Sequence, residues 1–356
     1  MCTKPVGIAV IGSGGIAKIA HLPAYSKLRD EGKVDIIALA DVNEETAKEA
    51  AAKFNVSNIY TDYAALLQLP EVDAVSVCTP NYLHMQTTID ALNAGKHVLV
   101  EKPIALNAVE GAAMLYAAER NNKKLQVGLN LRYGQYPQAI KRFINDGKLG
   151  DIYFARAHAL RRRGIPGWGV FTQKDKQGGG PLIDIGVHIL DLTLWMMGHP
   201  EPASVTGQTY TKFGTREGVI GLLGKWDPKI FTVEDFAAGF VRFKNGATLV
   251  LESSFCANIE KDEFSSQIMG TEGGAILDPF DGTRNKLFRE ESGSLIDSVP
   301  FPLPNYPQTH ELEIRAFIQA IADDTPVEVP GEQGLMVTRI LDAIYESSET
   351  GKEILL

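Results

Sequence analysis

The stretch VGIAVIGSGGIA at residues 6–17 decides how the N-terminal third of this chain folds. Its first half is apolar and partly β-branched, which predicts a short buried strand. Its second half has the G-x-G-x-x-A spacing and leads into a helical pattern. In such a turn Gly12 allows the sharp reversal, Gly14 lets the backbone approach a pyrophosphate, and Ala17 lets helix and strand pack closely. The N-terminus of the helix also offers unpaired N–H groups to that anion.

The next predicted strand ends in an acidic residue. The segment VDIIALAD stops at Asp41, 24 positions after Ala17. That offset is near the roughly 20 positions expected for a carboxylate that accepts hydrogen bonds from the adenosine ribose. Because a carboxylate there repels a 2′-phosphate, the spacing predicts NAD in preference to NADP. Asp41 could instead be a surface residue before the next helix, whose start Asn43-Glu44-Glu45 has an N-cap pattern.

Strands and helices alternate through the rest of this third. The patterns predict strands over 72–79, 97–103 and 124–130, and helices over 81–95 and 107–121. Repeated units of this length imply a doubly wound parallel sheet, with ligands at the carboxyl ends of its strands. Lys102 stands at such an end, directly before Pro103. We interpret it as functional, although a lysine there could also be an ordinary surface residue.

The residues expected to bind the dinucleotide lie in the glycine turn and at the predicted strand ends. His84 follows one of these ends and has either a place near the nicotinamide or a packing role. His21, His97, His199 and His310 are interpreted as surface or turn residues. The full cofactor-binding set is Gly12, Ser13, Gly14, Gly15, Ile16, Asp41, Cys78, Thr79, Pro80, Asn81, His84, Glu101 and Lys102.

After Asn130 the pattern changes, which predicts a first domain at 1–129 and a second at 130–356. In the second, an alternating strand at 151–160 precedes a series of strands between 235 and 279. Asn245-Gly246 between two of these strands is a hairpin signal. Strands in series predict an open, largely antiparallel sheet in an α+β domain. Helices near 309–323 and 332–348 close the chain and could pack back on the first domain.

One later segment combines a core-like pattern with ionisable residues. GGGPLIDIGVHILDLTLWMMG, at residues 178–198, is apolar enough for a buried helix, yet it contains Asp184, His188 and Asp191. At i, i+4 and i+7 these residues share one stripe of an α-helix. Burying them costs free energy unless they are paired or lie beside a cavity. The segment therefore predicts either a satisfied Asp–His contact in a core or a functional site, where its glycine run would let a ligand approach the backbone.

Four motifs, in this order, resemble the Gfo/Idh/MocA oxidoreductases, named for glucose–fructose oxidoreductase and inositol dehydrogenase. They are GSGGIA at 12–17, CTPNYLH at 78–84, AGKHVLVEKP at 94–103 and GGGPLIDIGVHILD at 178–191. The E-K-P and D-x-x-x-H elements after a Rossmann half are specific, whereas the glycine turn alone is not. The resemblance spans nearly the whole chain. It implies an N-terminal Rossmann domain that binds NAD(P), followed by a domain with an open sheet.

The resemblance also implies roles for three residues. Lys102 matches the E-K-P lysine, and Asp184 and His188 match the D-x-x-x-H pair. Members with these residues oxidise a secondary hydroxyl group of a sugar or cyclitol, or run the reverse reduction. His188 would then take the hydroxyl proton, Asp184 would orient it, and Lys102 would stabilise the developing alkoxide. The candidates for substrate binding are Lys102, Arg132, Tyr133, His158, Arg163, Trp168, Asp184 and His188.

Three other functions stay open at this point. Asp184 and His188 could be metal ligands, but two ligands are too few for a catalytic zinc site and no third is evident. The resemblance also includes glycosidases that use NAD for transient oxidation. It includes non-catalytic sugar or dinucleotide sensors as well, although a sensor would not need the lysine and histidine that this chain has.

The overall composition narrows the setting of the protein. A net charge of −9 and a pI near 5.4 disfavour nucleic acid as a partner. Cys2, Cys78 and Cys256 are too scattered for a disulfide framework or a zinc–thiolate site, and no signal peptide or membrane span is evident. We therefore expect a cytoplasmic enzyme that uses NAD and no metal. Both faces of the strand at 236–243 are apolar, which predicts a homodimer or homotetramer formed through this sheet.

Overall fold

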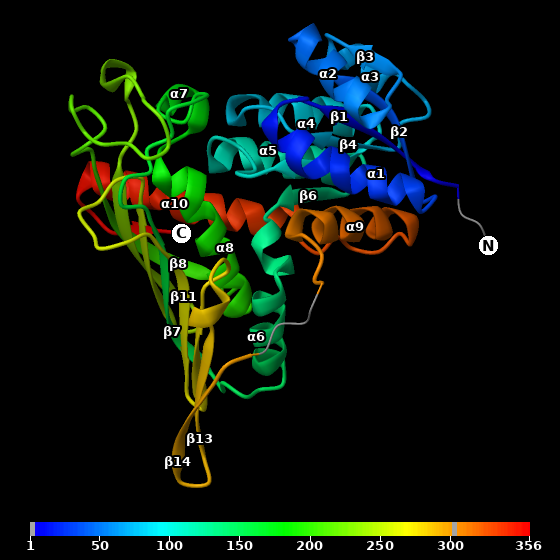
Figure 1. The fold of residues 1–356 in the computed structure, drawn as a ribbon. Helices are drawn as coiled ribbons and strands as arrows, with labels where there is room; N and C mark the ends of the chain where they lie inside the picture. The colour runs from blue at the N-terminus through cyan, green and yellow to red at the C-terminus, as the bar shows by residue number, and fades with distance from the viewer. Residues whose placement is uncertain (1–3, 301–304) are drawn as a thin grey trace. The chain divides into compact units, whose positions relative to one another are not determined.

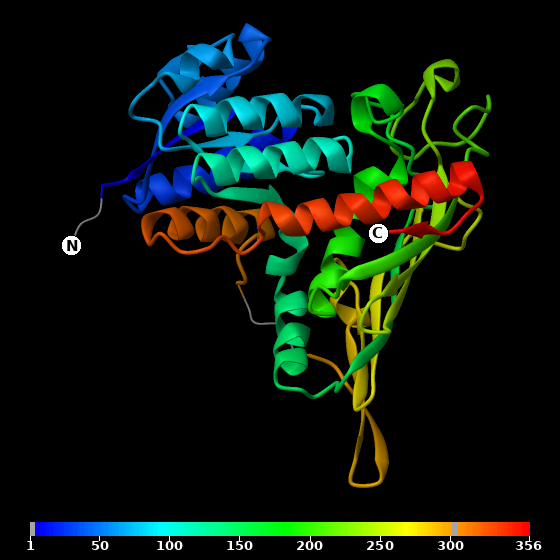
Figure 2. The same cartoon turned by 180° about the vertical axis from the view of Figure 1, so that it is seen from behind.

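The computed structural model describes residues 4–300 and 305–356 (Figures 1 and 2). The chain divides into two compact units. The first contains the chain up to Asn130 together with Pro307–Leu335, and the second contains Leu131–Tyr306 and Met336–Leu356. Cys2 lies outside the described residues.

The first unit is built on a parallel sheet, as the alternation of strands and helices predicts. Among the described residues, six strands pair in the order β3-β2-β1-β4-β5-β6, all in parallel. The order reverses at β1, which pairs with both β2 and β4, and ligands bind at such a switch point. The strands are β1 (Val6–Ile11), β2 (Val34–Ala40), β3 (Asn58–Tyr60), β4 (Ala74–Val77), β5 (His97–Glu101) and β6 (Leu125–Gly128).

Helices pack on this sheet, including one from near the end of the chain. α1 and α9 pack together, and Ile314 and Phe317 of α9 join Ile8 and Val10 of β1 in one buried cluster. Arg315 of α9 donates two hydrogen bonds, of 2.6 and 2.7 Å, to the carboxylate that follows α1. The helices are α1 (Leu22–Asp30), α2 (Glu44–Phe54), α3 (Tyr63–Leu67), α4 (His84–Asn93), α5 (Ala108–Arg120) and α9 (Thr309–Ala322).

The second unit is built on a mixed sheet. Nine strands in the described part of the chain pair in the order β14-β13-β12-β11-β7-β10-β9-β8-β15. β7 and β10 are parallel and the other neighbours are antiparallel, so the predicted fold class is confirmed for both halves. The strands are β7 (Ile152–Leu160), β8 (Pro202–Tyr210), β9 (Phe236–Phe243), β10 (Thr248–Ser254), β11 (Glu263–Gly270), β12 (Gly273–Leu277), β13 (Lys286–Glu291), β14 (Ser294–Ser298) and β15 (Ile354–Leu355).

Helices cover one face of this sheet. α8 (Val187–Met196) packs on β7 and β11, while Ile344 of α10 (Gly331–Thr350) lies against Gly207 of β8 and Gly239 of β9. On β9 the residues that face these helices are fully buried, whereas Phe236 and Phe240 on the opposite face are only half-buried. The described part of this unit also contains the helices α6 (Gln135–Asn145) and α7 (Lys174–Gln177).

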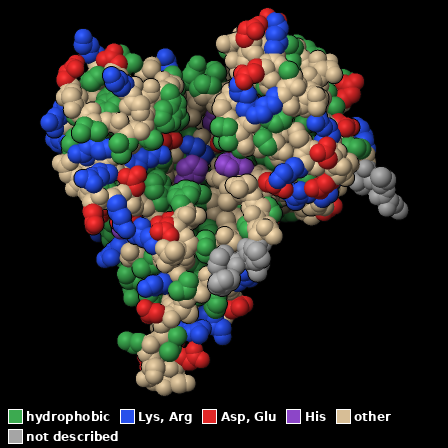
Figure 3. Space-filling view, viewed as in Figure 1, with side chains coloured by type: hydrophobic (Ala, Val, Ile, Leu, Met, Phe, Trp, Pro, Cys, Tyr) green, Lys and Arg blue, Asp and Glu red, His purple; other side chains and the backbone are tan. Residues whose placement is uncertain are grey.

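Two further features concern the distribution of surface charge and the apolar character of the helices. Acidic and basic side chains are interspersed over the face of the molecule shown in Figure 3. Within residues 4–300 and 305–356, no helix combines the length and the apolar character needed to cross a membrane.

Candidate active site

The turn after β1 has the open geometry that a dinucleotide needs. Gly12 has a φ of +91°, and a Cβ there would lie 2.6 Å from the carbonyl oxygen of Cys78. Only glycine therefore fits where the turn passes the end of β4. A Cβ on Gly14 or Gly15 would meet no atom within 4 Å, so the space beside these residues is open. An anion can reach the N–H groups of the helix start there.

Asp41 follows β2 and lies beside this turn. Its carboxylate accepts a hydrogen bond from the backbone N–H of Ser13 at 2.8 Å and from that of Asn43 at 2.9 Å. The N-cap of α2 is Asn43, whose side chain accepts hydrogen bonds from two backbone N–H groups, so Asp41 does not cap this helix. Asp41 is half-buried, at the position where a bound ribose would need an acceptor. The glycine turn and this carboxylate together fit NAD.

His84 joins the loops that follow β4 and β5. It is fully buried, with Nδ1 2.8 Å from the carbonyl oxygen of Pro103 and Nε2 2.9 Å from that of Thr79. Burial lowers the pKa of His84. These contacts favour the packing role for His84 over contact with the nicotinamide, because both ring nitrogens face the backbone. The histidine thereby links the Lys102–Pro103 segment to the loop after β4.

Glu101, the last residue of β5, lies in a buried polar cluster. Its Oε1 lies 2.8 Å from His21 Nε2, and His21 Nδ1 lies 3.1 Å from the hydroxyl of Ser76. The same hydroxyl lies 2.7 Å from that of Tyr25. The expected surface position of His21 is therefore wrong. The helix starts with a π-helical turn at Ala17–His21, and this turn directs the imidazole into the core.

The His21–Glu101 pair is ionised and supports the segment that contains Lys102. Burial opposes charge on Glu101, but the hydrogen bond with His21 and the nearby positive charges of His21, His310 and Lys102 together outweigh it and lower the carboxyl pKa to about 2. Burial likewise opposes protonation of His21, yet Cys78 and Glu101 raise its pKa well above the ordinary value. The second oxygen of Glu101 accepts a hydrogen bond from the backbone N–H of Lys102 at 3.2 Å. We therefore assign Glu101 to holding Lys102 in place rather than to contacting the dinucleotide.

The D-x-x-x-H element lies in the second unit and is not one regular α-helix. Asp184 lies in a π-helical turn, Leu182–Gly186, and His188 lies in the first turn of α8 directly after it. Asp184 is 7% exposed and His188 is half-buried. Asp191 differs from Asp184, because the two carboxylates pair with different arginines. π-helical turns of this kind are frequent at functional sites.

The glycine run before this element is closed rather than open. A Cβ on Gly179 would lie 1.9 Å from the Tyr345 hydroxyl, and one on Gly180 would lie 2.2 Å from the Glu234 carbonyl oxygen. The expectation that this run lets a ligand approach the backbone is therefore not met at these two glycines. Glu234 instead caps the π-helical turn, with its carboxylate accepting from Gly180 N at 2.9 Å, Leu182 N at 3.1 Å and Tyr345 OH at 2.9 Å.

Arg132 and Asp191 form a buried ion pair within the second unit. The Arg132 Nε donates to Asp191 Oδ2 at 2.8 Å, and Nη2 donates to Oδ1. The side chains are 3% and 1% exposed. Removing one partner from such a pair is strongly destabilising. Arg132 was expected to bind substrate. Because its guanidinium group is hydrogen-bonded to Asp191, we assign it a structural role instead.

His158 lies on the wrong face of the sheet for a substrate role. On β10, Ser253 faces the helices, since its hydroxyl donates to Pro181 O at 2.8 Å beside the π-helical turn. The neighbouring residue Glu252 faces the other way and is the direct cross-strand partner of His158. His158 lies 3.4 Å from Glu263 on that opposite face. The predicted contact of His158 with substrate is therefore contradicted by the register of the sheet.

The remaining substrate candidates differ in their surroundings. Arg163 anchors a loop, because its guanidinium donates to Ala257 O at 2.8 Å and to Asn258 Oδ1 at 2.6 Å. Trp168 is 56% exposed and lies edge-on to Phe171, and Tyr133 is buried. The sequence showed a run of arginines at 161–163 that could meet a polar sugar, but only Arg163 was named as a candidate, whereas Arg161 Nη1 lies 3.9 Å from Asp184 Oδ2. The signal was available, since Arg161 is the first residue after the strand end of β7.

No metal site is apparent in the part of the chain that the structure describes. There, no three His, Cys, Asp or Glu side chains gather closely enough to hold a metal ion. Asp184 and His188 thus do not belong to such a group within the described residues.

Comparisons with known proteins add to this geometry. A family profile described as "Oxidoreductase family, NAD-binding Rossmann fold" matches residues 6–129. A second, described as "Oxidoreductase family, C-terminal alpha/beta domain", matches residues 141–356.

Individual relatives are similar over almost the whole length. The chain is 34% identical to D-glucoside 3-dehydrogenase of Escherichia coli K12, over 99% of this chain and 98% of the relative. It is 26% identical to myo-inositol 2-dehydrogenase of Thermotoga maritima, over 98% of both chains. A solved structure of levoglucosan dehydrogenase in complex with NADH and levoglucosan has a TM-score of 0.85 and 25% identity, over 99% of both chains.

Proposed function

Because this chain belongs to the Gfo/Idh/MocA oxidoreductase family, with its NAD-binding Rossmann fold, we propose that it oxidises a secondary hydroxyl group of a sugar, sugar derivative or cyclitol. A glycoside of glucose is the first substrate to test. The observation that carries the proposal is 34% identity to a D-glucoside 3-dehydrogenase along 99% of the chain. The open glycine turn and the Asp184–His188 element, each described within its own unit, support it.

The proposed reaction assigns one task to each residue. NAD, held by the glycine turn and Asp41, supplies the hydride acceptor when it is bound. His188 accepts the proton of the substrate hydroxyl group as the carbinol C–H bond breaks, so that alcohol and NAD⁺ give ketone, NADH and one proton. Lys102 places positive charge where the alkoxide develops, and Asp184 orients His188 or a substrate hydroxyl.

A substrate panel tests the proposed function. The protein is incubated with NAD and with methyl glucosides, free aldoses and inositols, while NADH is followed by absorbance and the sugars by chromatography. We expect net NADH and a keto-sugar from at least one compound. Sugar release without net NADH would identify an NAD-dependent glycosidase instead. Binding without turnover would identify a sensor, and either result would contradict the dehydrogenase.

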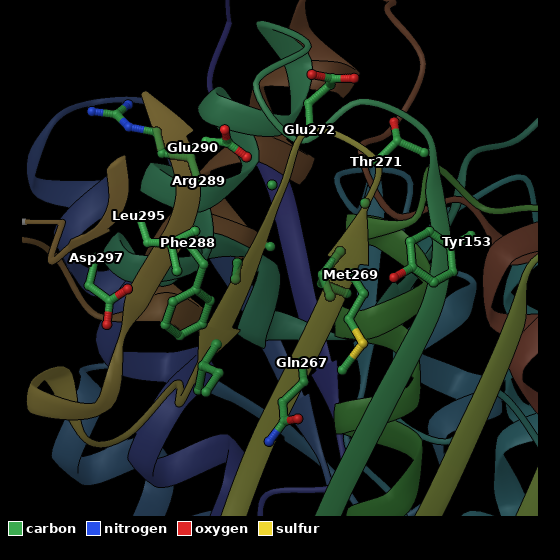
Figure 4. A pocket seen from close by; sticks show the side chains of 16 residues that line it. Tyr153, Gln267, Met269, Thr271, Glu272, Phe288, Arg289, Glu290, Leu295 and Asp297 are labelled. Atoms are coloured by element: carbon green, nitrogen blue, oxygen red, sulfur yellow. The ribbon is translucent and has the colours of Figure 1, made fainter. Parts of the chain in front are cut away.

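We also propose a homo-oligomer formed through the uncovered face of the second-unit sheet. This face bears half-buried Phe236 and Phe240 on β9 and Val250 on β10. A groove of about 630 Å³ lies on the same sheet, between β11, β12, β13 and β14 (Figure 4). Its lining includes Met269, Phe288 and Leu295. Apolar surfaces of this kind are commonly buried by a second subunit.

A reducing, cytoplasmic setting is part of the same proposal. Cys78 and Cys256 are free thiols, and both are buried. Free buried thiols suit a compartment where disulfides do not form.

A further inference from the structure

The Arg161-Arg162-Arg163 run contains three arginines with different surroundings. Arg162 donates to the Glu260 carbonyl oxygen at 2.9 Å, and Arg163 donates to the backbone and side chain of the loop at 257–258. Both therefore anchor loops. Arg161 differs from them, because its guanidinium lies 3.9 Å from Asp184, one of the residues of the proposed site.

The position of Arg161 is fixed by its neighbours. Its backbone pairs with Ser254 of β10 through hydrogen bonds of 2.9 and 3.1 Å. The aliphatic part of its side chain lies over Gly164, where a Cβ would come within 2.4 Å of the Arg161 Cδ. Its guanidinium donates to the Gly164 carbonyl oxygen at 3.3 Å and lies 5.7 Å from the centre of the Phe255 ring. Little side-chain entropy is then left to lose when a ligand binds.

The distance between Arg161 and Asp184 suits a hydroxyl group. At 3.9 Å the Arg161 Nη1 and Asp184 Oδ2 attract each other but make no direct hydrogen bond. An oxygen about 2.8 Å from each atom can bridge them, donating to the carboxylate and accepting from the guanidinium. A hydroxyl group is both donor and acceptor, and a carboxylate has room for several donors. The side chains are 22% and 9% exposed, so such a contact is only partly screened by water.

We propose that Arg161 and Asp184 form a donor–acceptor pair that binds one hydroxyl group of the sugar, other than the group that is oxidised. Arg161 is thereby a specificity-determining residue. This inference rests on the proposed function. It adds Arg161 to the proposed substrate site and explains why the enzyme would prefer polyhydroxylated rings to simple secondary alcohols. A charged donor left without its hydroxyl partner weakens binding of an analogue that lacks the group.

Deoxy analogues test the pair directly. The kcat/KM for methyl β-D-glucopyranoside is compared with those for its 2-, 4- and 6-deoxy analogues, in the unmodified protein and in Arg161→Gln. We expect one analogue to be worse by about 10-fold or more in the unmodified protein, as for a hydrogen bond to a charged group. In Arg161→Gln the loss for that analogue should shrink several-fold, while the relative losses for the other two stay the same.

Two further variants keep the test decisive. Gly164→Ala retains every charge but places a Cβ where the Arg161 stem lies, so it should reduce discrimination at the same hydroxyl group. Arg162→Gln removes one charge from the same run and should leave all four kcat/KM values unchanged. NADH binding, measured by fluorescence, shows whether each variant is folded.

Three outcomes separate the possible failures. Equal deoxy losses in the unmodified protein and in folded Arg161→Gln would overturn the assignment of Arg161. If Arg161→Gln does not fold, Gly164→Ala provides the test. A loss for the deoxy analogue in Gly164→Ala equal to that in the unmodified protein would also overturn the assignment of Arg161. If the unmodified protein forms no NADH from any sugar of the panel, the proposed function fails, and this inference fails with it.

Discussion

Asp41 is the residue that we propose to determine the choice of cofactor. Its carboxylate already accepts hydrogen bonds from Ser13 and Asn43, which fixes it beside the glycine turn. A fixed negative charge there should repel the 2′-phosphate of NADP. We predict that NAD is preferred, and that Asp41→Ala lowers the NAD/NADP ratio of kcat/KM by about 10-fold or more, the scale of a charged hydrogen bond.

A neighbouring variant serves as the control for Asp41. Asn43→Ala removes the α2 cap and should cost about 1 kcal/mol of stability without changing the cofactor ratio. Equal or better kinetics with NADP in the unmodified protein would contradict the assignment of Asp41.

His188 is the proposed general base. Removing such a group typically costs about 10²–10⁴ in rate, so His188→Ala should lower kcat by that factor and leave the Kd for NAD nearly unchanged. Asp184→Asn keeps the shape of the side chain, and its effect should be non-additive with that of His188→Ala. If His188 only fills a core, His188→Ala would instead lower the Tm and spare turnover. Steady-state kinetics and thermal melting on the same preparations distinguish the two roles.

Sequence patterns indicated some site residues and not others. Gly12, Asp41, Asp184 and His188 belong to local motifs whose spacing is visible in the chain. The contact of His21 with Glu101 joins residues that are 80 positions apart, and no local pattern predicts it. The wrong expectations for His21 and His158 have the same cause. Burial and sheet register are set by tertiary packing, which periodicity within one segment does not report.

At the scale of elements, long periodic segments were predicted well. The strands and helices that the sequence predicted in the first unit and the helices near 309–323 and 332–348 are confirmed, whereas β3 and α3 were not predicted. β3 has only three residues, and four of the six residues of β13 are charged, so the signal of these strands in the sequence is weak. The π-helical turns at Ala17–His21 and Leu182–Gly186 were also not predicted. They depend on packing against neighbouring elements rather than on residue type.

The His21–Glu101 pair connects one π-helical turn to β5, and its stability should depend on pH. The pKa of His21 is higher in the folded protein than in the unfolded chain. His21 therefore stabilises the fold fully below its pKa in the unfolded chain, and this stabilisation is lost as the pH rises through its pKa in the folded protein. Glu101 stabilises the fold above its pKa in the unfolded chain. This stabilisation is lost as the pH falls toward the pKa of Glu101 in the folded protein, which is about 2. His21→Gln breaks a buried pair and should cost about 3 kcal/mol. Urea denaturation should show the largest difference near pH 5–6 and a smaller one at strongly alkaline pH. A difference that is independent of pH would contradict an ionised pair.

At the scale of the whole molecule, family membership confirms the oxidoreductase class and the NAD-binding fold that the motifs indicated. The motifs were sufficient because the glycine turn, E-K-P and D-x-x-x-H elements occur in one order along the chain. The oligomeric state has no such motif and stays a prediction. It depends on the shape and apolar character of a surface formed by several strands.

The uncovered sheet face gives the prediction for assembly. In the unmodified protein we expect a dimer or tetramer in sedimentation velocity at micromolar concentration. Phe240→Asp, which places a charge on this face, should shift the population toward monomer. Lys53→Glu on α2 of the first unit is the control and should leave the assembly unchanged. A monomer in the unmodified protein would refute the proposed interface.

The most direct test of the central claim follows the transferred hydrogen itself. Methyl β-D-glucopyranoside deuterated at carbon 3 is incubated with NAD and the protein, and the reduced cofactor is analysed by mass spectrometry. If the protein moves hydride from the carbinol carbon to the nicotinamide, deuterium appears in the reduced cofactor and the sugar becomes a ketone. Reduced cofactor without deuterium, together with a keto-sugar at carbon 3, would contradict direct hydride transfer, and release of the methyl group with no reduced cofactor would identify a glycosidase.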